Sequence, residues 1–267
     1  MKEIQSIVKD LFESKKINLF IGYKEDKYYG SMPVFITSGE EVDKLVFNSN
    51  FKQNLATYLL KPEVKIFGKI AILANYPAVK TILQLAAENQ INEGDYLLLV
   101  ISENNTPLLL ENFEDMAMFV NQNLPKPSME IINRIKEIED KSREDRWNFW
   151  VNEFSSCIKC FACRSVCPMC YCVQCAVECN QPQLIPVAPT AQGNLEWHIT
   201  RIMHLAGRCI SCGECSRVCP MEIPLSILNA KMNQFILNKF GQKAGFSSEP
   251  DYALNIYKVD DKENFIR

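Results

Sequence analysis

Residues Cys157-Ile158-Lys159-Cys160-Phe161-Ala162-Cys163 and Cys167-Pro168 form a motif that recurs as Cys209-Ile210-Ser211-Cys212-Gly213-Glu214-Cys215 and Cys219-Pro220. Both copies have the spacing CxxCxxCxxxCP, in which closely spaced thiolates reach the iron corners of a 4Fe–4S cluster. Structural zinc sites instead pair CxxC steps across longer loops, so two complete copies favour iron. The sequence therefore predicts two 4Fe–4S clusters.

The spacing also predicts which cysteines share a cluster. In two-cluster ferredoxins the fourth cysteine of each copy, before the proline, ligates the other cluster. The first cluster is therefore assigned to Cys157, Cys160, Cys163 and Cys219. The second cluster is assigned to Cys209, Cys212, Cys215 and Cys167.

Four further cysteines directly follow the first copy, with the spacing CxCxxCxxxC. Their number suits a third 4Fe–4S cluster, and idle thiols beside redox centres would be open to oxidation. Zinc ligation, and free or mixed thiols, remain alternatives for this group. The candidate ligands of the third cluster are Cys170, Cys172, Cys175 and Cys179.

Composition excludes several other classes of protein. The chain has 267 residues, 47% of them hydrophobic, and a net charge of −3, without the basic excess of a nucleic-acid-binding protein. Its twelve cysteines are confined to residues 157–219, unlike the spread of a secreted disulfide scaffold. The first residues have no signal-peptide pattern, and no apolar run could span a bilayer. We therefore expect a cytoplasmic protein without a direct membrane span.

The residues before the cysteines predict a small α/β domain. Residues 64–74 and 95–102 are apolar and β-rich, as in buried strands, and residues 78–90 between them have a helical pattern. This order predicts a βαβ unit, and Pro107 indicates a loop after it. The expected organisation is an α/β docking domain at 1–123, a helical linker at 124–145, a mostly α-helical ferredoxin-like domain at 146–245 and an irregular tail at 246–267.

Other residue patterns give weaker indications. The sequence has no GxGxxG fingerprint, so FAD is not expected. His198 and His204 are interpreted as core or hydrogen-bonding residues rather than ligands, because histidine ligation is rare in these clusters. Cations beside the cysteines either are ordinary surface charges or offset the charge of a cluster. These cations are Lys159, Arg164, Arg208 and Arg217.

Several segments resemble known iron–sulfur proteins. They are residues 157–164, 168–172 and 204–209, the exit Ile223-Pro224, and N-terminal segments such as 21–23, 33–36 and 45–48. In these the chain resembles the dicluster family related to the β subunits of deazaflavin-reducing hydrogenase and formate dehydrogenase. The motifs with their flanking helices are also similar to the α-helical ferredoxin module found in the iron–sulfur subunits of succinate dehydrogenase and heterodisulfide reductase.

The resemblance implies an electron-transfer subunit of a low-potential anaerobic oxidoreductase complex. It would relay single electrons through two or three clusters between a flavoprotein or soluble ferredoxin and a catalytic subunit, without transforming a substrate itself. One alternative is a flavin-binding reductase subunit that acts on a deazaflavin or similar acceptor. Another is a redox-sensing interaction protein whose clusters act as labile switches.

Overall fold

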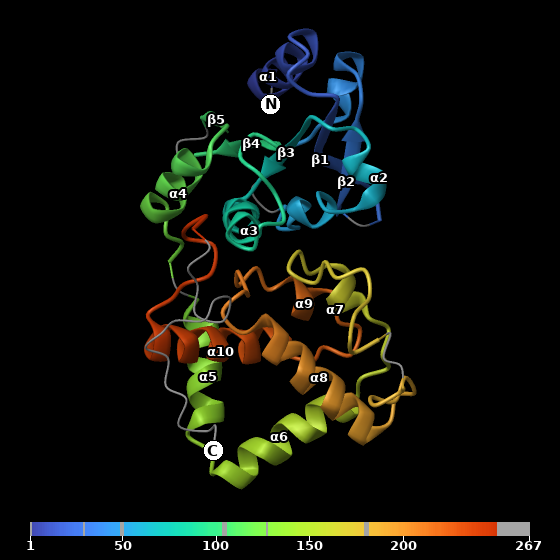
Figure 1. Ribbon diagram of the computed structural model, residues 1–267, viewed down its shortest axis with the longest axis vertical. Coiled ribbons are helices and arrows are strands. Elements are labelled where there is room, and N and C mark those ends of the chain that lie inside the picture. The colour runs from blue at the N-terminus through green and yellow to red at the C-terminus, as the bar shows by residue number, and fades with distance from the viewer. Residues whose placement is uncertain are drawn as a thin grey trace.

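The protein has a first half built on a mixed β-sheet and a second half of helices and cysteine-bearing loops (Figure 1). The α/β architecture that the sequence predicts is confirmed. No helix in the part of the chain that the structure describes has the length and hydropathy to cross a membrane. The computed structural model describes residues 2–28, 30–48, 51–102, 106–126, 128–178 and 182–249.

The sheet has five strands in the order β2-β1-β3-β4-β5. The inner strands β1, β3 and β4 run parallel, and each edge strand pairs antiparallel with its neighbour. Every residue of β3 is buried, as expected for a central strand covered on both faces. The strands are β1 (Leu19–Asp26), β2 (Gly30–Ile36), β3 (Ile70–Ala74), β4 (Tyr96–Ile101) and β5 (Pro107–Leu110).

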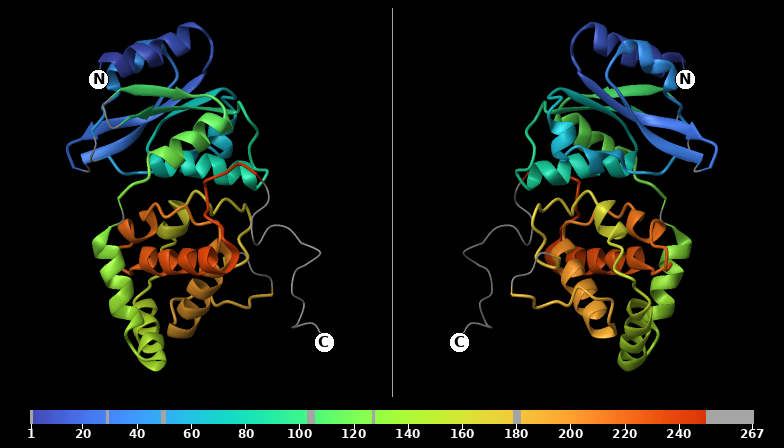
Figure 2. Two further views of the ribbon diagram at one scale, coloured as in Figure 1. Left: turned by 90° about the vertical axis from the view of Figure 1, so that its left-hand side faces the viewer. Right: turned by 90° about the vertical axis from the view of Figure 1, so that its right-hand side faces the viewer.

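Helix α3 (Tyr76–Ala87) connects the parallel strands β3 and β4 and forms the expected βαβ unit. Asn75 caps its first turn, where the Asn75 side-chain oxygen accepts a hydrogen bond from the Ala78 N–H at 3.0 Å. Pro77 lies in the first turn of the helix, where a backbone N–H has no hydrogen-bond partner within the helix. Ten of its twelve residues are buried, because α3 lies between the sheet and the second half of the molecule (Figure 2).

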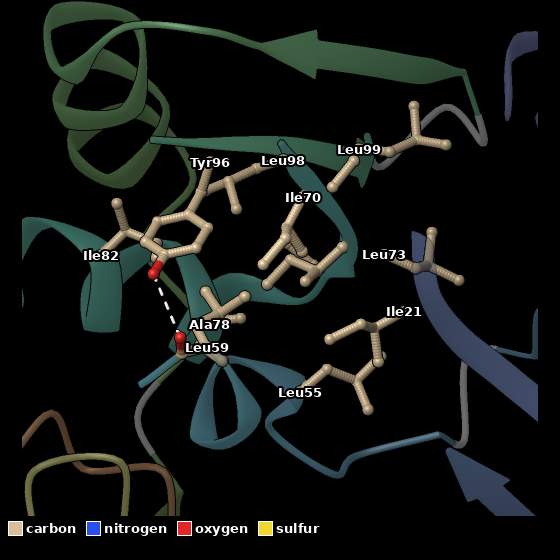
Figure 3. Packing of buried hydrophobic residues seen from close by; sticks show 14 of the residues in the cluster. Ile21, Leu55, Leu59, Ile70, Leu73, Ala78, Ile82, Tyr96, Leu98 and Leu99 are labelled. Carbon is tan, nitrogen blue, oxygen red and sulfur yellow. Dashed lines mark hydrogen bonds between the residues drawn. The ribbon is translucent and has the colours of Figure 1, made fainter. Parts of the chain in front are cut away.

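Helices cover both faces of the sheet. Helix α1 (Lys2–Glu13) lies on one face, and α3 and α4 (Phe113–Gln122) lie on the other (Figure 2). The core between α3 and the sheet is aliphatic, and the Tyr96 hydroxyl donates to the Leu59 carbonyl at 3.1 Å (Figure 3). Three short helical segments complete this half: η1 (Gly39–Lys44), η2 (Leu55–Tyr58) and α2 (Pro62–Lys65).

Two expectations about these elements are wrong. The buried strand expected at 64–74 begins only at Ile70, because Pro62 starts helix α2 and Gly68 turns the chain with a φ of +74°. Pro107 begins strand β5 instead of a loop. A proline is compatible with this position, because it is the first residue of an edge strand, where one missing N–H is tolerated.

The second half is helical, as expected. Its four long helices are α5 (Met129–Glu139), α6 (Arg143–Ser155), α8 (Ala191–Leu205) and α10 (Leu225–Phe240). Two one-turn helices, α7 (Ala162–Ser165) and α9 (Glu214–Arg217), lie within the two motifs. Helix α6 packs on α8, and α10 packs on α5, α8 and α9. Helix α5, in the expected linker, thus belongs to the helical half by its contacts, whereas the domain boundaries remain predictions.

Candidate functional site

The two cysteine motifs fold in the same way. The third and fifth residues of each copy have a positive φ: 52° at Lys159 and 58° at Phe161, then 61° at Ser211 and 75° at Gly213. A one-turn helix, α7 or α9, follows at the same offset in each copy. Positive φ is uncommon outside glycine, so the repeated pattern indicates that the motif imposes one local fold. That fold curls the chain around its closely spaced cysteines.

The first cavity brings together cysteines from both copies. Cys157, Cys160 and Cys163 line it with Cys219 of the second copy. Burial, together with the three other thiols and against the opposing charge of Arg201, raises the pKa of Cys163 to about 11. Buried thiols of this kind stay protonated when no metal is bound. They ionise when a metal binds, because ligation releases the proton.

A second cavity has the complementary set of cysteines. Cys209, Cys212 and Cys215 line it with Cys167 of the first copy. Burial raises the pKa of both Cys212 and Cys215 to about 12. Cys163 of the first cavity and Cys215 of the second pack in one cluster of buried side chains, so the two cavities are neighbours. Each cavity is thus lined by three cysteines of one copy and the fourth cysteine of the other, and the assignment of ligands to clusters stays a prediction.

A third cavity lies beside the second and has three arginines on its wall. Three of the remaining cysteines, Cys170, Cys172 and Cys175, line it. A hydrogen bond to Cys167, together with burial, raises the pKa of Cys170, which places this thiol against the second set. Cys179, the fourth candidate ligand, lies outside the described residues. The arginines on this cavity are Arg164, Arg201 and Arg208, and His204 also lines it.

Buried polar groups beside the first two cavities lack partners. The Trp197 Nε1 and both ring nitrogens of His198 border the first cavity and make no hydrogen bond. Burial lowers the pKa of His198 to about 3, so the ring is neutral and one nitrogen has a proton to donate. Arg201, which borders the second and third cavities, has an unpaired Nε and Nη1. A buried donor without a partner costs about 1–3 kcal/mol, which indicates that an acceptor belongs there.

These features fit iron–sulfur clusters. The inorganic sulfides and thiolates of a cluster accept hydrogen bonds from the protein, so the unpaired donors of Trp197, His198 and Arg201 would gain partners. Within the described residues, no three His, Cys, Asp or Glu side chains converge as ligands of a single ion. Cysteines that surround a space suit a cluster, because each thiolate binds its own iron.

Polar side chains on two helices hold the cysteine loops in place. Asn194 on α8 donates to the Cys157 carbonyl at 2.7 Å, and Arg201 on the same helix donates to the Cys163 carbonyl at 2.9 Å. Asn233 on α10 donates to the Cys209 carbonyl at 2.7 Å. Sequence reasoning missed all three of these contacts. The sequence pattern that could have revealed them is a polar residue at helical spacing on an otherwise apolar face, as with Asn194 and Arg201 on α8.

The cations beside the cysteines are mostly paired with carboxylates. Arg208 forms a two-pronged ion pair with Glu88 at the end of α3, which also accepts from the Tyr171 hydroxyl at 2.6 Å. Arg164 pairs with Glu178 at 3.0 Å. Arg217 pairs with Glu214, and Lys159 donates to the Pro186 carbonyl. Glu88, which sequence reasoning did not propose as a site residue, thus joins the α/β half to Arg208 on the wall of the third cavity.

The two histidines differ in their surroundings. His198 is 1% exposed and stacks on Phe154, with ring centroids 4.5 Å apart. His204 is exposed and lies on the wall of the third cavity. His198 therefore lies in the core, as expected.

Comparison with known proteins gives two informative relatives, and no family model matches the chain. The F420-dependent formate dehydrogenase subunit beta of Methanocaldococcus jannaschii is 31% identical over 132 residues, which are 47% of this chain and 34% of the relative. The F420-dependent formate dehydrogenase 1 subunit beta of Methanococcus maripaludis is 29% identical over 173 residues, 60% of this chain and 44% of the relative. The chain thus spans less than half the length of either relative. The expected similarity to formate dehydrogenase β subunits is confirmed.

Proposed function

We propose that this protein is an iron–sulfur electron-transfer subunit of an oxidoreductase complex. The observation that carries the proposal is the crosswise gathering of eight motif cysteines around two adjoining cavities. In this proposal Cys157, Cys160, Cys163 and Cys219 hold one 4Fe–4S cluster. Cys209, Cys212, Cys215 and Cys167 hold the other. Such clusters supply one-electron redox chemistry at potentials that the protein sets through charge, hydrogen bonds and solvent exposure.

The protein's own residues hold and insulate the electron path. Cys163 and Cys215, one from each cavity, pack in the same buried cluster, which would place the two clusters close enough for an electron to pass between them. Trp197 lines the first cavity and is 2% exposed, and Phe154, also 2% exposed, stacks on His198 behind the same wall, so this side of the cavity is shielded from water. Arg201 borders the second cavity and holds the Cys163 carbonyl of the first, so its charge acts on both.

The third cavity is proposed as a third 4Fe–4S site. Cys170, Cys172 and Cys175 supply three ligands, and Cys179 is the fourth candidate. Arg201, on the wall of this cavity, would offset part of the negative charge of a cluster with four thiolates. Zinc and free thiols are the competing occupants, and metal analysis separates them.

The proposed partners are supported by the names of the two relatives, which describe β subunits of a formate dehydrogenase. We propose that this chain passes electrons between a flavoprotein, or a soluble ferredoxin, and a low-potential catalytic subunit. The α/β half would serve as the docking module. The catalytic step would then lie in the partner and not in this chain.

The first experiment measures iron, acid-labile sulfide, zinc and flavin per chain after anaerobic purification, with EPR of the reduced protein. About twelve irons indicate three clusters and about eight indicate two, since each 4Fe–4S cluster holds four. Iron below one cluster per chain, or zinc in its place, would contradict the proposal. Bound flavin would favour the reductase alternative.

A pair of double variants tests the crosswise ligation. With crosswise sets, C160A/C219A removes two ligands of one cluster and costs about four irons, whereas C212A/C219A damages both clusters and costs about eight. Ligation within each motif predicts the opposite order. The two variants are matched because each removes two cysteines and they share Cys219.

A further inference from the structure

A lysine of the α/β half is buried against the second cysteine cavity. Lys80, on α3, is 7% exposed. Its ammonium donates to the Ile210 carbonyl at 3.0 Å. Ile210 directly follows Cys209 and lies two residues before Cys212. A side chain that is 130 residues away in sequence is thus placed on the loop that carries two proposed ligands.

The charge of Lys80 has no carboxylate beside it. Within the described residues, Lys80 takes part in no salt bridge, and the Phe246 ring lies 4.9 Å from its ammonium. Burial lowers the pKa of Lys80 to about 8, while the Cys209 and Cys212 thiols favour its charged form. A buried cation without a counter-charge is costly, so anionic sulfurs nearby would stabilise the charged form of Lys80.

The chain after α10 closes over this lysine. The Gly245 N–H donates to the side-chain oxygen of Gln84 at 3.0 Å. Gly245 has a φ of +73°, and a Cβ at this position would lie 2.5 Å from the Lys80 carbonyl oxygen. Only glycine fits so close to α3. The loop therefore seals Lys80 from water and keeps its charge directed at the cysteine side.

We propose that Lys80 is the contribution of the α/β half to the second cysteine site, where its charge raises the reduction potential of the bound cluster. This inference rests on the proposed function, because it requires a cluster at that site. One electron from the external donor makes the site more negative by one charge, and no proton is needed. A buried ammonium stabilises the reduced form more than the oxidised form, because the electrostatic attraction grows with the negative charge.

The test compares K80M with K243M in EPR-monitored redox titrations of the full chain, with iron counted in each protein. The signal that is lost in C212A marks the second site. In K80M we expect the equilibrium constant for reduction of this site to fall about tenfold, which is 59 mV for a one-electron couple. Lys243 is an exposed lysine 5.5 Å from the same Phe246 ring, so K243M should shift the potential much less.

Two more variants separate charge from packing. K80Q keeps a donor for the Ile210 carbonyl but loses the charge, so it should behave like K80M. K80R keeps the charge and should stay near the wild-type potential. Loss of iron from the second site in both uncharged variants, but not in K80R, would also support the role of the charge.

Two results overturn the inference: unchanged potentials in K80M with full iron content, or an equal effect in K80R. Failure of the proposed function looks different, because the unmodified protein itself would then lack iron at this site.

Discussion

The two halves of this protein differ in how completely their own side chains satisfy one another. All the buried side-chain polar atoms found without a partner in the described residues lie between positions 178 and 229. Buried polar residues of the α/β half are paired, as where Asn54 donates to the Thr81 hydroxyl at 2.9 Å. Because unpaired buried donors are costly, the comparison indicates that the cysteine half needs its ligands to be stable, whereas the α/β half does not.

Removal of iron is the strongest way to test this difference. Metal binding contributes directly to the folding free energy, because the unfolded chain rarely holds a preformed site. We expect a chelator under anaerobic conditions to abolish amide hydrogen-exchange protection across α7, α8 and α9, while β3 and β4 stay protected. Exchange measured by mass spectrometry reports both halves in one experiment. Equal loss of protection in the sheet would contradict the independence of the α/β half.

A substitution that leaves a cavity in the sheet should destabilise the α/β half and leave the cysteine half intact. Ile72 is fully buried in the central strand β3. I72A should cost about 2–5 kcal/mol in the free energy of unfolding of the α/β half, from lost burial and the cavity left behind. The matched control is L108A on the edge strand β5, where the side chain is 47% exposed. Denaturant titration checks the stability, and iron content under native conditions should stay at the wild-type value.

Weakening the contact between Glu88 and the cysteine half should give the smallest change in stability of the three. E88Q keeps the shape of the Glu88 side chain but removes its charge, so the hydrogen bonds from Arg208 and Tyr171 lose their charge assistance. We expect a loss of about 1.5–3 kcal/mol, with earlier release of iron from the second and third sites during chelation. K16M, which breaks the exposed pair with Glu111, should change stability by about 0–1 kcal/mol. An equal effect of both variants would argue against Glu88 as the link.

Local patterns explain what could be predicted. The βαβ unit followed from two apolar runs on either side of a helical segment. The prediction was poor where a single residue overrode the pattern. Apolar residues from Val64 onward resembled a strand, but Pro62 and Gly68 diverted them into a helix and a turn. Pro107 was misassigned because an edge strand tolerates a proline that a central strand would not.

The candidate site was predictable in its cysteines and not in its surroundings. Motif spacing assigned each ligand set before the fold was known, because a short loop between cysteines restricts which iron corners they can reach. The residues that hold or adjust the site come from elsewhere: Asn233 from α10, and Lys80 and Glu88 from the α/β half. No spacing rule connects them to the cysteines.

The sequence by itself thus determined the motif loops, the α/β order and the crosswise expectation, since these depend on contacts within a few residues or on a repeated pattern. Only the tertiary structure decided that α3 lies against the second cavity, with Lys80 on the Ile210 carbonyl and Glu88 on Arg208. The physical reason is separation along the chain. These pairs are 130 and 120 residues apart, so they form only when the packing of two independently patterned halves brings them together.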